Sequence, residues 1–183
     1  ASDVYKRQAD QNSKECPTAF FDGRSMWFCV DLVGLDVIAH EYTHALTYYS
    51  IPDSYGQPSG LIYAGESGAL NEAFSDIFGA AIENYATHGQ GNWRIGEETR
   101  LASVLPMGAL RDLSHPTAYY TWLGRMPDRF HSDDVWCDDS VDFGGVHHNM
   151  SIFSFAAYLM AAGGNFNGCT IESIGRTKQE AVF

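Results

Sequence analysis

The chain has 183 residues, of which 45% are hydrophobic and 14% aromatic, and its formal net charge is −12. This length fits one domain or part of a larger one, with enough chain to bury a core. The net negative charge argues against nucleic acid as a partner, because phosphates would be repelled. No apolar run reaches the length of a membrane span, so no membrane segment is expected.

The four cysteines, Cys16, Cys29, Cys137 and Cys169, lack the C-x-x-C spacing of a thiolate zinc site. An even number suits disulfides in an oxidising compartment, and reduced buried thiols are the alternative. If bridges form, we favour Cys16–Cys29, since the residues between them are typical of a hairpin turn. Residues 1–8 resemble translated sequencing-adapter sequence, and we interpret them as non-native.

The first predicted elements are short strands and a long helix. Aromatic residues interrupted by Asp22-Gly23 predict short strands around a turn over 18–31. A helix over 34–49 is indicated by an apolar stripe expected to face the core, made of Leu35, Ile38, Ala39, Tyr42, Ala45, Leu46 and Tyr49. The prolines and glycines of 50–60 predict a loop.

Three further helices are predicted. One covers 67–85, and another covers 149–162 and is ended by Gly163-Gly164. A last helix is expected from Thr170, with no stop signal before Phe183, so the chain is expected to end within it. The stripe expected to be buried on the helix over 67–85 is Leu70, Ala73, Phe74, Ile77, Phe78, Ala81 and Tyr85.

The segment His40-Glu41-Tyr42-Thr43-His44 spells H-E-x-x-H within the first helix. Residues four apart lie on the same face of a helix, so the two imidazoles can hold one zinc ion. Glu41 lies beside them, where it can take a proton from a zinc-bound water. The pattern predicts metal-assisted hydrolysis of an amide bond. A chance pair of histidines is the alternative, and the third ligand decides between them.

The third ligand is predicted on the following helix. One large class continues H-E-x-x-H-x-x-G-x-x-H, but Thr47 and Ser50 occupy the Gly and His positions, which excludes that class. Glu72 can instead complete a His2Glu site and leave the fourth position to water. Asp76, one turn further on, can accept the outer N–H of a ligand histidine.

The segment GESGALNEAFSDIFG, residues 65–79, resembles the glutamate-ligand helix of the thermolysin-like metalloproteases, and residues 36–41 resemble the start of that family's zinc helix. The resemblance extends over 19–183. It implies an α+β fold, truncated at both ends. Residues 9–33 would end a β-rich lobe, and residues 34–183 would form a predominantly helical zinc-binding lobe, incomplete at its C-terminus.

The function that the resemblance implies is that of a secreted, monomeric zinc endopeptidase. It would hydrolyse protein or peptide substrates with one catalytic zinc and a zinc-activated water. The alternative function is a non-catalytic zinc-binding or adhesion domain descended from such a protease. A second alternative is a related enzyme that acts on another bond or only on short peptides. Because part of the cleft would be missing, the piece alone need not be active.

Residues alone do not distinguish between His147 and His148 as a catalytic histidine. The family's G-G-V-H segment matches residues 144–147, which selects His147 as the donor to the tetrahedral intermediate. Asp142 would orient it and favour its cationic form. Tyr63 matches the tyrosine that donates to the developing oxyanion.

Four positions are similar to the family's substrate-contacting residues. Arg111 matches the arginine that binds the substrate's backbone carbonyl beyond the scissile bond. Ala19 also matches a substrate-binding position. Val37 and Leu110 would line an apolar pocket for the residue after the cleaved bond, which implies a preference for bulky apolar side chains.

Structural calcium is also implied by the resemblance. The matching oxygen ligands are Asp36, Glu83, Asn92 and Glu97. Arg94 replaces an expected acid, so at most one calcium site is expected.

Overall fold

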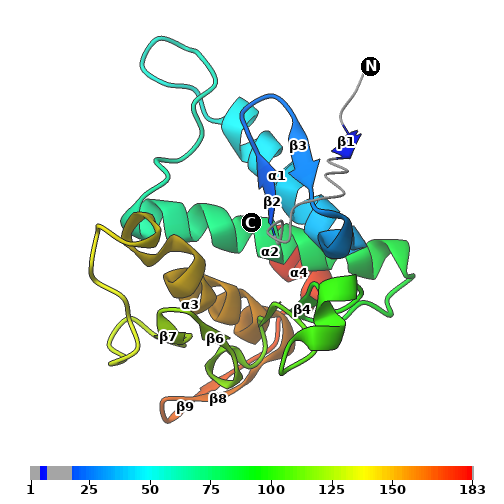
Figure 1. The fold of residues 1–183 in the computed structure, drawn as a ribbon. Helices are drawn as coiled ribbons and strands as arrows, with labels where there is room; N and C mark the ends of the chain where they lie inside the picture. Colours follow the sequence, from blue (N-terminus) through cyan, green and yellow to red (C-terminus); the bar gives the residue numbers. More distant parts are fainter. Residues whose placement is uncertain (1–4, 8–17, 183) are drawn as a thin grey trace.

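The computed structural model describes residues 5–7 and 18–182, and long helices dominate that part. They are α1 (Leu35–Ser50), α2 (Gly65–Ala86) and α3 (Asp142–Ala162). Helix α2 packs against both α1 and α3, and it crosses the middle of the molecule (Figure 1). No helix in the described ranges is long and apolar enough to cross a membrane.

The three long helices and the short strands around them confirm the predicted α+β fold, which is predominantly helical.

A small sheet precedes α1 and has the strand order β1-β3-β2. Strand β2 (Ala19–Phe21) pairs antiparallel with β3 (Met26–Phe28), and β1 (Tyr5–Arg7) pairs parallel with β3. The β2–β3 turn is held by Asp22, whose carboxylate accepts two backbone N–H groups and the indole N–H of Trp27. These elements confirm the predicted strands around a turn.

The cysteines divide into two kinds. Cys29 is disulfide-bonded, whereas Cys137 and Cys169 are free and exposed. Cys16, its expected partner, lies outside the described residues, as do residues 1–4 of the segment interpreted as non-native.

The prediction of which face of α1 is buried is wrong. Leu35, Tyr42, Leu46 and Tyr49 are 36%, 47%, 46% and 58% exposed. Ala39 of the predicted stripe is buried and Ile38 is partly buried against the core, but the other buried residues of the helix, Asp36, Val37, His40, Glu41 and Thr43, lie off that stripe. Helix α1 packs against α2 through the face that carries the histidines, because the polar side chains of α2 bond to them there. The face that carries the chemistry is also the packed face.

Helix α2 is buried around most of its circumference. Ala73 and Ile77 are fully buried, as predicted. Tyr85, which was also expected in the core, is 86% exposed near the end of the helix, so that prediction is wrong. Gly79 lets α1 approach closely, since a Cβ there would lie 2.8 Å from the carbonyl oxygen of Asp36.

Helix α3 begins with four residues in the left-handed backbone conformation. Asp142, Phe143, Gly144 and Gly145 have φ values of 51°, 52°, 89° and 75°, and regular helix follows. Regular helix was predicted only from Asn149. We call residues 142–145 the left-handed turn.

The helix predicted from Thr170 is wrong. Strands β8 (Gly164–Phe166) and β9 (Cys169–Ile171) form a hairpin there, and α4 (Arg176–Glu180) is short. Between the strands, Asn167 and Gly168 have φ values of 50° and 79°. Two positive φ values in an Asn-Gly pair are typical of the tight turn that suits a twisted hairpin. This turn signal decides the local structure.

Short strands join the remaining segments to the core. Strand β4 (Arg94–Ile95) pairs with β5 (Arg111–Asp112), and β6 (Tyr120–Thr121) pairs with β7 (Gly124–Arg125). Short 3-10 helices cover Val30–Leu32, Arg100–Val104 and Pro116–Ala118. One core cluster contains Met26, Phe28, Val37, Ile77, Ile95 and Leu113, so it joins the first sheet, α1, α2 and the β4–β5 pair.

Candidate active site

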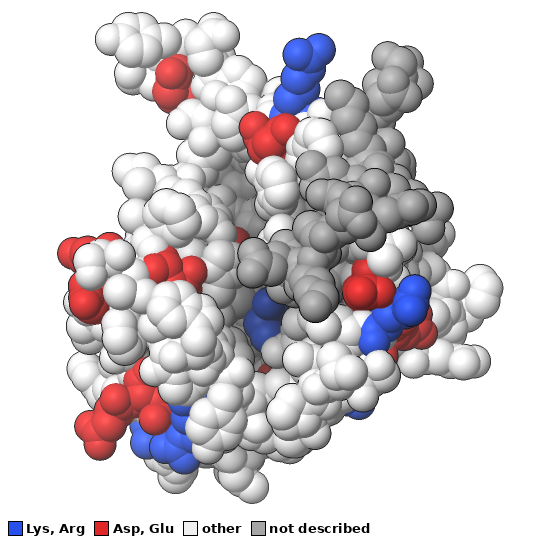
Figure 2. Space-filling model, in the orientation of Figure 1, with Lys and Arg blue, Asp and Glu red and all other residues white. Residues whose placement is uncertain are grey.

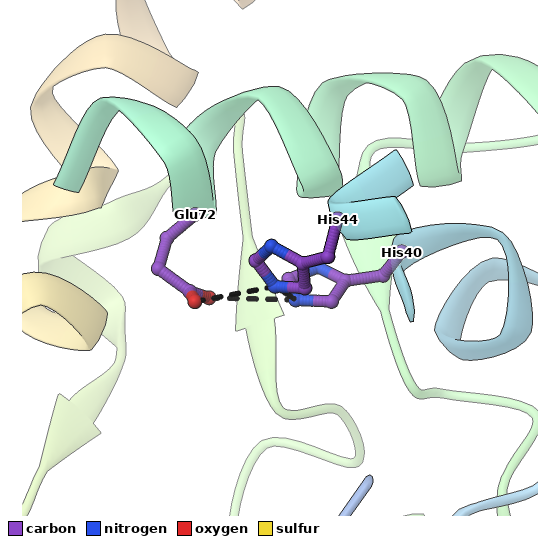
Figure 3. Close-up of side chains that lie close together, drawn as sticks. All are labelled: His40, His44 and Glu72. Carbon is purple, nitrogen blue, oxygen red and sulfur yellow. Dashed lines mark hydrogen bonds and ion pairs between the residues drawn. The ribbon is translucent and has the colours of Figure 1, made fainter. Parts of the chain in front are cut away.

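Three side chains from two helices converge on one point. His40 and His44 extend from α1 and Glu72 extends from α2 (Figure 3). The two imidazole Nε2 atoms lie 3.0 Å apart. They lie 3.4 Å and 3.3 Å from the two carboxylate oxygens of Glu72. Among the described residues, this is the one group of three or more His, Cys, Asp or Glu side chains with ligand atoms within 4.8 Å of one another.

Each histidine is oriented through its outer nitrogen. Nδ1 of His40 lies 2.7 Å from Oδ1 of Asp76, and Nδ1 of His44 lies 2.9 Å from Oδ1 of Asn71. Carboxylate and amide oxygens accept hydrogen bonds, so both Nδ1 atoms carry the proton. The lone pairs of the two Nε2 atoms therefore face each other and Glu72.

This donor set fits a cation. The buried Oε2 of Glu72 accepts no hydrogen bond, although the residue is 1% exposed. Burial lowers the pKa of His40, but the adjacent carboxylates of Asp76 and Glu72 outweigh it and raise that pKa to about 10. Burial raises the pKa of Glu72, and the two histidines hold it well below its usual range. Two imidazoles and a carboxylate are common zinc ligands, and they leave a fourth position open.

Glu41 lies next to His40, His44 and Glu72 but takes no part in the contacts that join these three side chains. It is 4% exposed and lines the same cleft, and its Oε2 has no hydrogen-bond partner. Burial raises its pKa above the usual range of a carboxyl group, against the opposing effect of His40 and His44. A carboxylate with a raised pKa is well suited to accept a proton and release it later.

Tyr63 and His147 both lie against Glu72 in the ligand group. The Tyr63 hydroxyl donates to Oε1 of Glu72 and lies 3.1 Å from Nε2 of His147. Nδ1 of His147 lies 2.6 Å from Oδ1 of Asp142. Burial lowers the pKa of His147, but the bond to Asp142 reverses this and raises it. Two potential donors thus lie beside the metal-ligand group.

His148, the neighbouring histidine, has different surroundings. It is 1% exposed, and its ring nitrogens lie 2.7 Å from Oγ1 of Thr121 and 2.8 Å from the carbonyl oxygen of Asp134. His148 therefore joins α3 to Thr121 and Asp134, and it is not among the residues that line the cleft. The geometry brings His147 to the ligand group, as the resemblance implied.

Arg111 is tied to the metal-ligand group through Asp76. Its Nε and Nη2 donate to the two carboxylate oxygens of Asp76 at 2.6 Å and 2.7 Å. Burial raises the pKa of Asp76, but Arg111 and His40 outweigh it and lower that pKa. Asp76 is therefore an ionised, fully buried carboxylate shared between a guanidinium and a histidine.

A cleft of about 690 Å³ contains these groups. A hollow is visible near the centre of the face drawn in Figure 2. The predicted substrate-contacting residues Ala19, Val37, Leu110 and Arg111 line the cleft together with the ligand group, Glu41, Tyr63 and His147. The structure thus brings these residues together around one cavity large enough for a small ligand or a peptide segment.

Comparisons with known proteins show the family of this chain. Residues 59–183 match the family described as "Thermolysin metallopeptidase, alpha-helical domain". The chain belongs to the thermolysin family of metallopeptidases. It is 39% identical over 162 residues to the thermostable neutral protease NprT of Geobacillus stearothermophilus, which covers 88% of this chain. It is 41% identical over 162 residues to bacillolysin of Bacillus cereus, again over 88% of this chain.

A solved structure of a metalloproteinase precursor has a similar fold. The precursor of protealysin from Serratia proteamaculans matches with a TM-score of 0.60 and 30% identity, over 78% of this chain and 45% of that chain. The chain spans 26% of the length of the first relative and 25% of the second.

Two residues of this thermolysin-family site were missed by the sequence analysis. Asn71 accepts from His44, and Oγ of Ser75 lies 3.1 Å from the same Nδ1. Both are buried polar residues four apart on α2, so they lie on one face of it, each directly before Glu72 or Asp76 in the chain. Their burial could not be anticipated, because the face of α1 that packs on α2 had been assigned incorrectly.

The predicted calcium ligands lie in one region without forming a metal site of the kind made by His40, His44 and Glu72. Asp36 accepts backbone N–H groups of Val37 and Gly96, and Asn92 donates to Glu97. In the described residues, the carboxylates of Asp36, Glu83 and Glu97 are not among the groups with three donor atoms within 4.8 Å. Calcium binding stays a prediction.

Glu83 provides a test of that prediction. It is 2% exposed, and burial together with the charges of Glu97 and Asp36 raises its pKa from 4.5 to about 7. The unfolded chain therefore loses this proton at a lower pH than the folded chain, and stability falls as the pH rises from 4.5 to about 7. Without calcium, E83Q should raise Tm at pH 8 and leave it unchanged at pH 4. Added calcium should stabilise the wild type but not E83Q, and equal stabilisation of both would contradict a site at Glu83.

Proposed function

We propose that this chain is the helical part of a zinc-dependent endopeptidase that hydrolyses peptide bonds in protein or peptide substrates. The observation that carries the proposal is the convergence of His40, His44 and Glu72 on one point of a cleft. Bound zinc would polarise the scissile carbonyl and lower the pKa of a coordinated water from ~15.7 toward ~7. Glu41, Tyr63 and His147 line the same cleft and would supply the rest of the chemistry.

Glu41 would be the general base. Its raised pKa and its unpaired oxygen favour acceptance of the proton of the attacking water. The same carboxyl group would then deliver this proton to the leaving amine.

Tyr63 and His147 would stabilise the oxyanion. Tyr63 presents its hydroxyl next to the ligand group. Asp142 accepts from Nδ1 of His147 and raises its pKa, which would favour the cationic ring that carries a proton on Nε2 as well. Fixed donors of this kind contribute about 3 kcal/mol each to transition-state binding. Asp76 would hold His40 in the required tautomer, as outer carboxylates do in other zinc sites.

Val37, Leu110 and Arg111 would bind the substrate beyond the scissile bond. Val37 and Leu110 present apolar side chains to the cleft, which favours a bulky apolar residue there. Arg111 would bind a backbone carbonyl, and its pairing with Asp76 fixes its position. Ala19 lies on β2, which is an edge strand of its sheet, and would lie alongside the substrate backbone.

The remaining proposals concern the context of the protein. Residues 9–33 would end a β-rich lobe, and residues 34–183 would form the zinc-binding helical lobe. We also propose that the protein is secreted and monomeric, and the disulfide bond of Cys29 suits an oxidising compartment.

A chelator assay separates this function from a non-catalytic zinc domain. The protein is freed of metal, titrated with zinc, and tested on a quenched fluorescent peptide with leucine after the scissile bond. We expect one zinc per chain and peptide cleavage that returns with zinc. Stoichiometric zinc binding without cleavage of any peptide would favour the adhesion or binding domain.

Tyr63→Phe should lower kcat/KM by about 10²-fold, because one oxyanion donor is lost. The zinc content should stay the same, since the hydroxyl is not a metal ligand. Steady-state kinetics and metal analysis of the purified variant measure the two effects. An unchanged kcat/KM would remove Tyr63 from the mechanism.

A further inference from the structure

Phe143 has a strained backbone conformation and an exposed aromatic side chain, and neither the packing of the core nor the proposed mechanism explains this combination. It lies in the left-handed turn at φ 52° and ψ 34°, where a bulky side chain is strongly disfavoured. Its side chain is not in the core, because the residue is 63% exposed. A residue such as asparagine or glycine would form the same turn with less strain.

The ring of Phe143 lies on the wall of the cleft. It contacts the ring of Tyr63 edge-to-face, with the ring centroids 5.5 Å apart. Tyr63 in turn contacts His147, with ring centroids 6.2 Å apart. An exposed aromatic surface thus borders the residues proposed to stabilise the oxyanion.

The position of Phe143 along the cleft differs from that of the apolar pocket. Val37 lies one helical turn before His40, and Arg111 is joined to His40 through Asp76. Tyr63 lies at the other end, where its ring centroid is 6.3 Å from that of His44. A peptide whose residue after the scissile bond enters the pocket at Val37 and Leu110 would therefore direct the preceding residue toward Phe143.

We propose that Phe143 is a specificity-determining residue that selects an aromatic or bulky apolar side chain on the amino-terminal side of the scissile bond. This inference rests on the proposed peptidase function. An edge-to-face or stacked aromatic contact at this position would favour phenylalanine over alanine by about threefold to tenfold. The strain of the turn would be retained because the ring contacts substrate.

The test compares two peptides with zinc-loaded protein. Both are non-cleavable reduced-amide analogues with leucine after the scissile position, and they carry phenylalanine or alanine before it. Calorimetry should show that the wild type binds the phenylalanine peptide about threefold to tenfold more tightly. In F143N this ratio should approach one, whereas F143Y should keep it. The preference for leucine over alanine after the scissile position should be unchanged in F143N.

Thermal unfolding gives an independent measurement. F143N should raise Tm by about 2 to 4 °C, because asparagine tolerates the left-handed conformation. W122A is the matched control: Trp122 is 75% exposed at the β6–β7 turn, so its loss should change neither the binding ratio nor the strain of the left-handed turn. An unchanged binding ratio or a lower Tm in F143N would overturn the inference about Phe143 and leave the proposed peptidase function standing. Failure of the wild type to bind either peptide would overturn the proposed function as well.

Discussion

Glu41→Gln should lower kcat for peptide hydrolysis by about 10²- to 10⁴-fold while zinc binding is retained. Glutamine has nearly the same shape as glutamate but cannot accept the proton of the attacking water. Glu41 is not one of the three converging ligands, so its replacement should leave the metal site intact. Loss of a buried carboxyl group whose pKa burial has raised should also stabilise the fold at neutral pH.

Three measurements check this result. Metal analysis should give the same zinc content as in the wild type, thermal unfolding should give an equal or higher Tm, and kinetics should show the loss of kcat. Glu66→Gln is a suitable control, because Glu66 is an exposed carboxylate in the first turn of α2. Retained turnover in E41Q would remove Glu41 from the role of general base.

Asp76→Asn should weaken both zinc binding and the fold. Asp76 is fully buried, and its carboxylate accepts from His40 and from two nitrogens of Arg111. Loss of an outer carboxylate typically lowers metal affinity by about 10- to 100-fold. Loss of its charge also leaves the guanidinium of Arg111, 19% exposed, without its counter-ion, which should cost about 3 kcal/mol of unfolding free energy.

Zinc titration and urea denaturation of the metal-free protein measure these two effects separately. The matched control is Asp128→Asn. Asp128 pairs with Arg129 at 2.8 Å, but Arg129 is 47% exposed, so this exposed pair should contribute at most about 1 kcal/mol. Equal losses of stability in the two variants would show that burial of the Asp76–Arg111 pair is unimportant.

The convergence of His40, His44 and Glu72 could be predicted because the spacing of these residues is local. His40 and His44 lie four apart on one helix, and Glu72 and Asp76 repeat that spacing on the next. The packing face of α1 could not be predicted in the same way. Four residues of its predicted stripe are exposed, and its buried face carries the histidines that bond to Asp76 and Asn71 on a different helix. Hydrophobic periodicity contains no information about such partners.

Turn chemistry explains a second difference between prediction and structure. The segment after Phe166 was predicted as helix, although Asn167-Gly168 is a strong signal for a hairpin turn. The left-handed turn is a harder case. Gly144 and Gly145 indicate unusual backbone, but Asp142 and Phe143 do not, and their conformation depends on surrounding tertiary contacts.

Asp142 has two functions in the left-handed turn. One oxygen of its carboxylate accepts the backbone N–H of His147 at 2.9 Å, and the other lies 2.6 Å from Nδ1 of the same residue. The group that fixes the start of the regular helix therefore also fixes the imidazole ring. A substitution of Asp142 that changes the basicity of His147 therefore also removes or weakens the hydrogen bond that stabilises the start of the regular helix in α3. A lower rate in an Asp142 variant would therefore report on the local order of α3 as well as on the loss of the oxyanion donor.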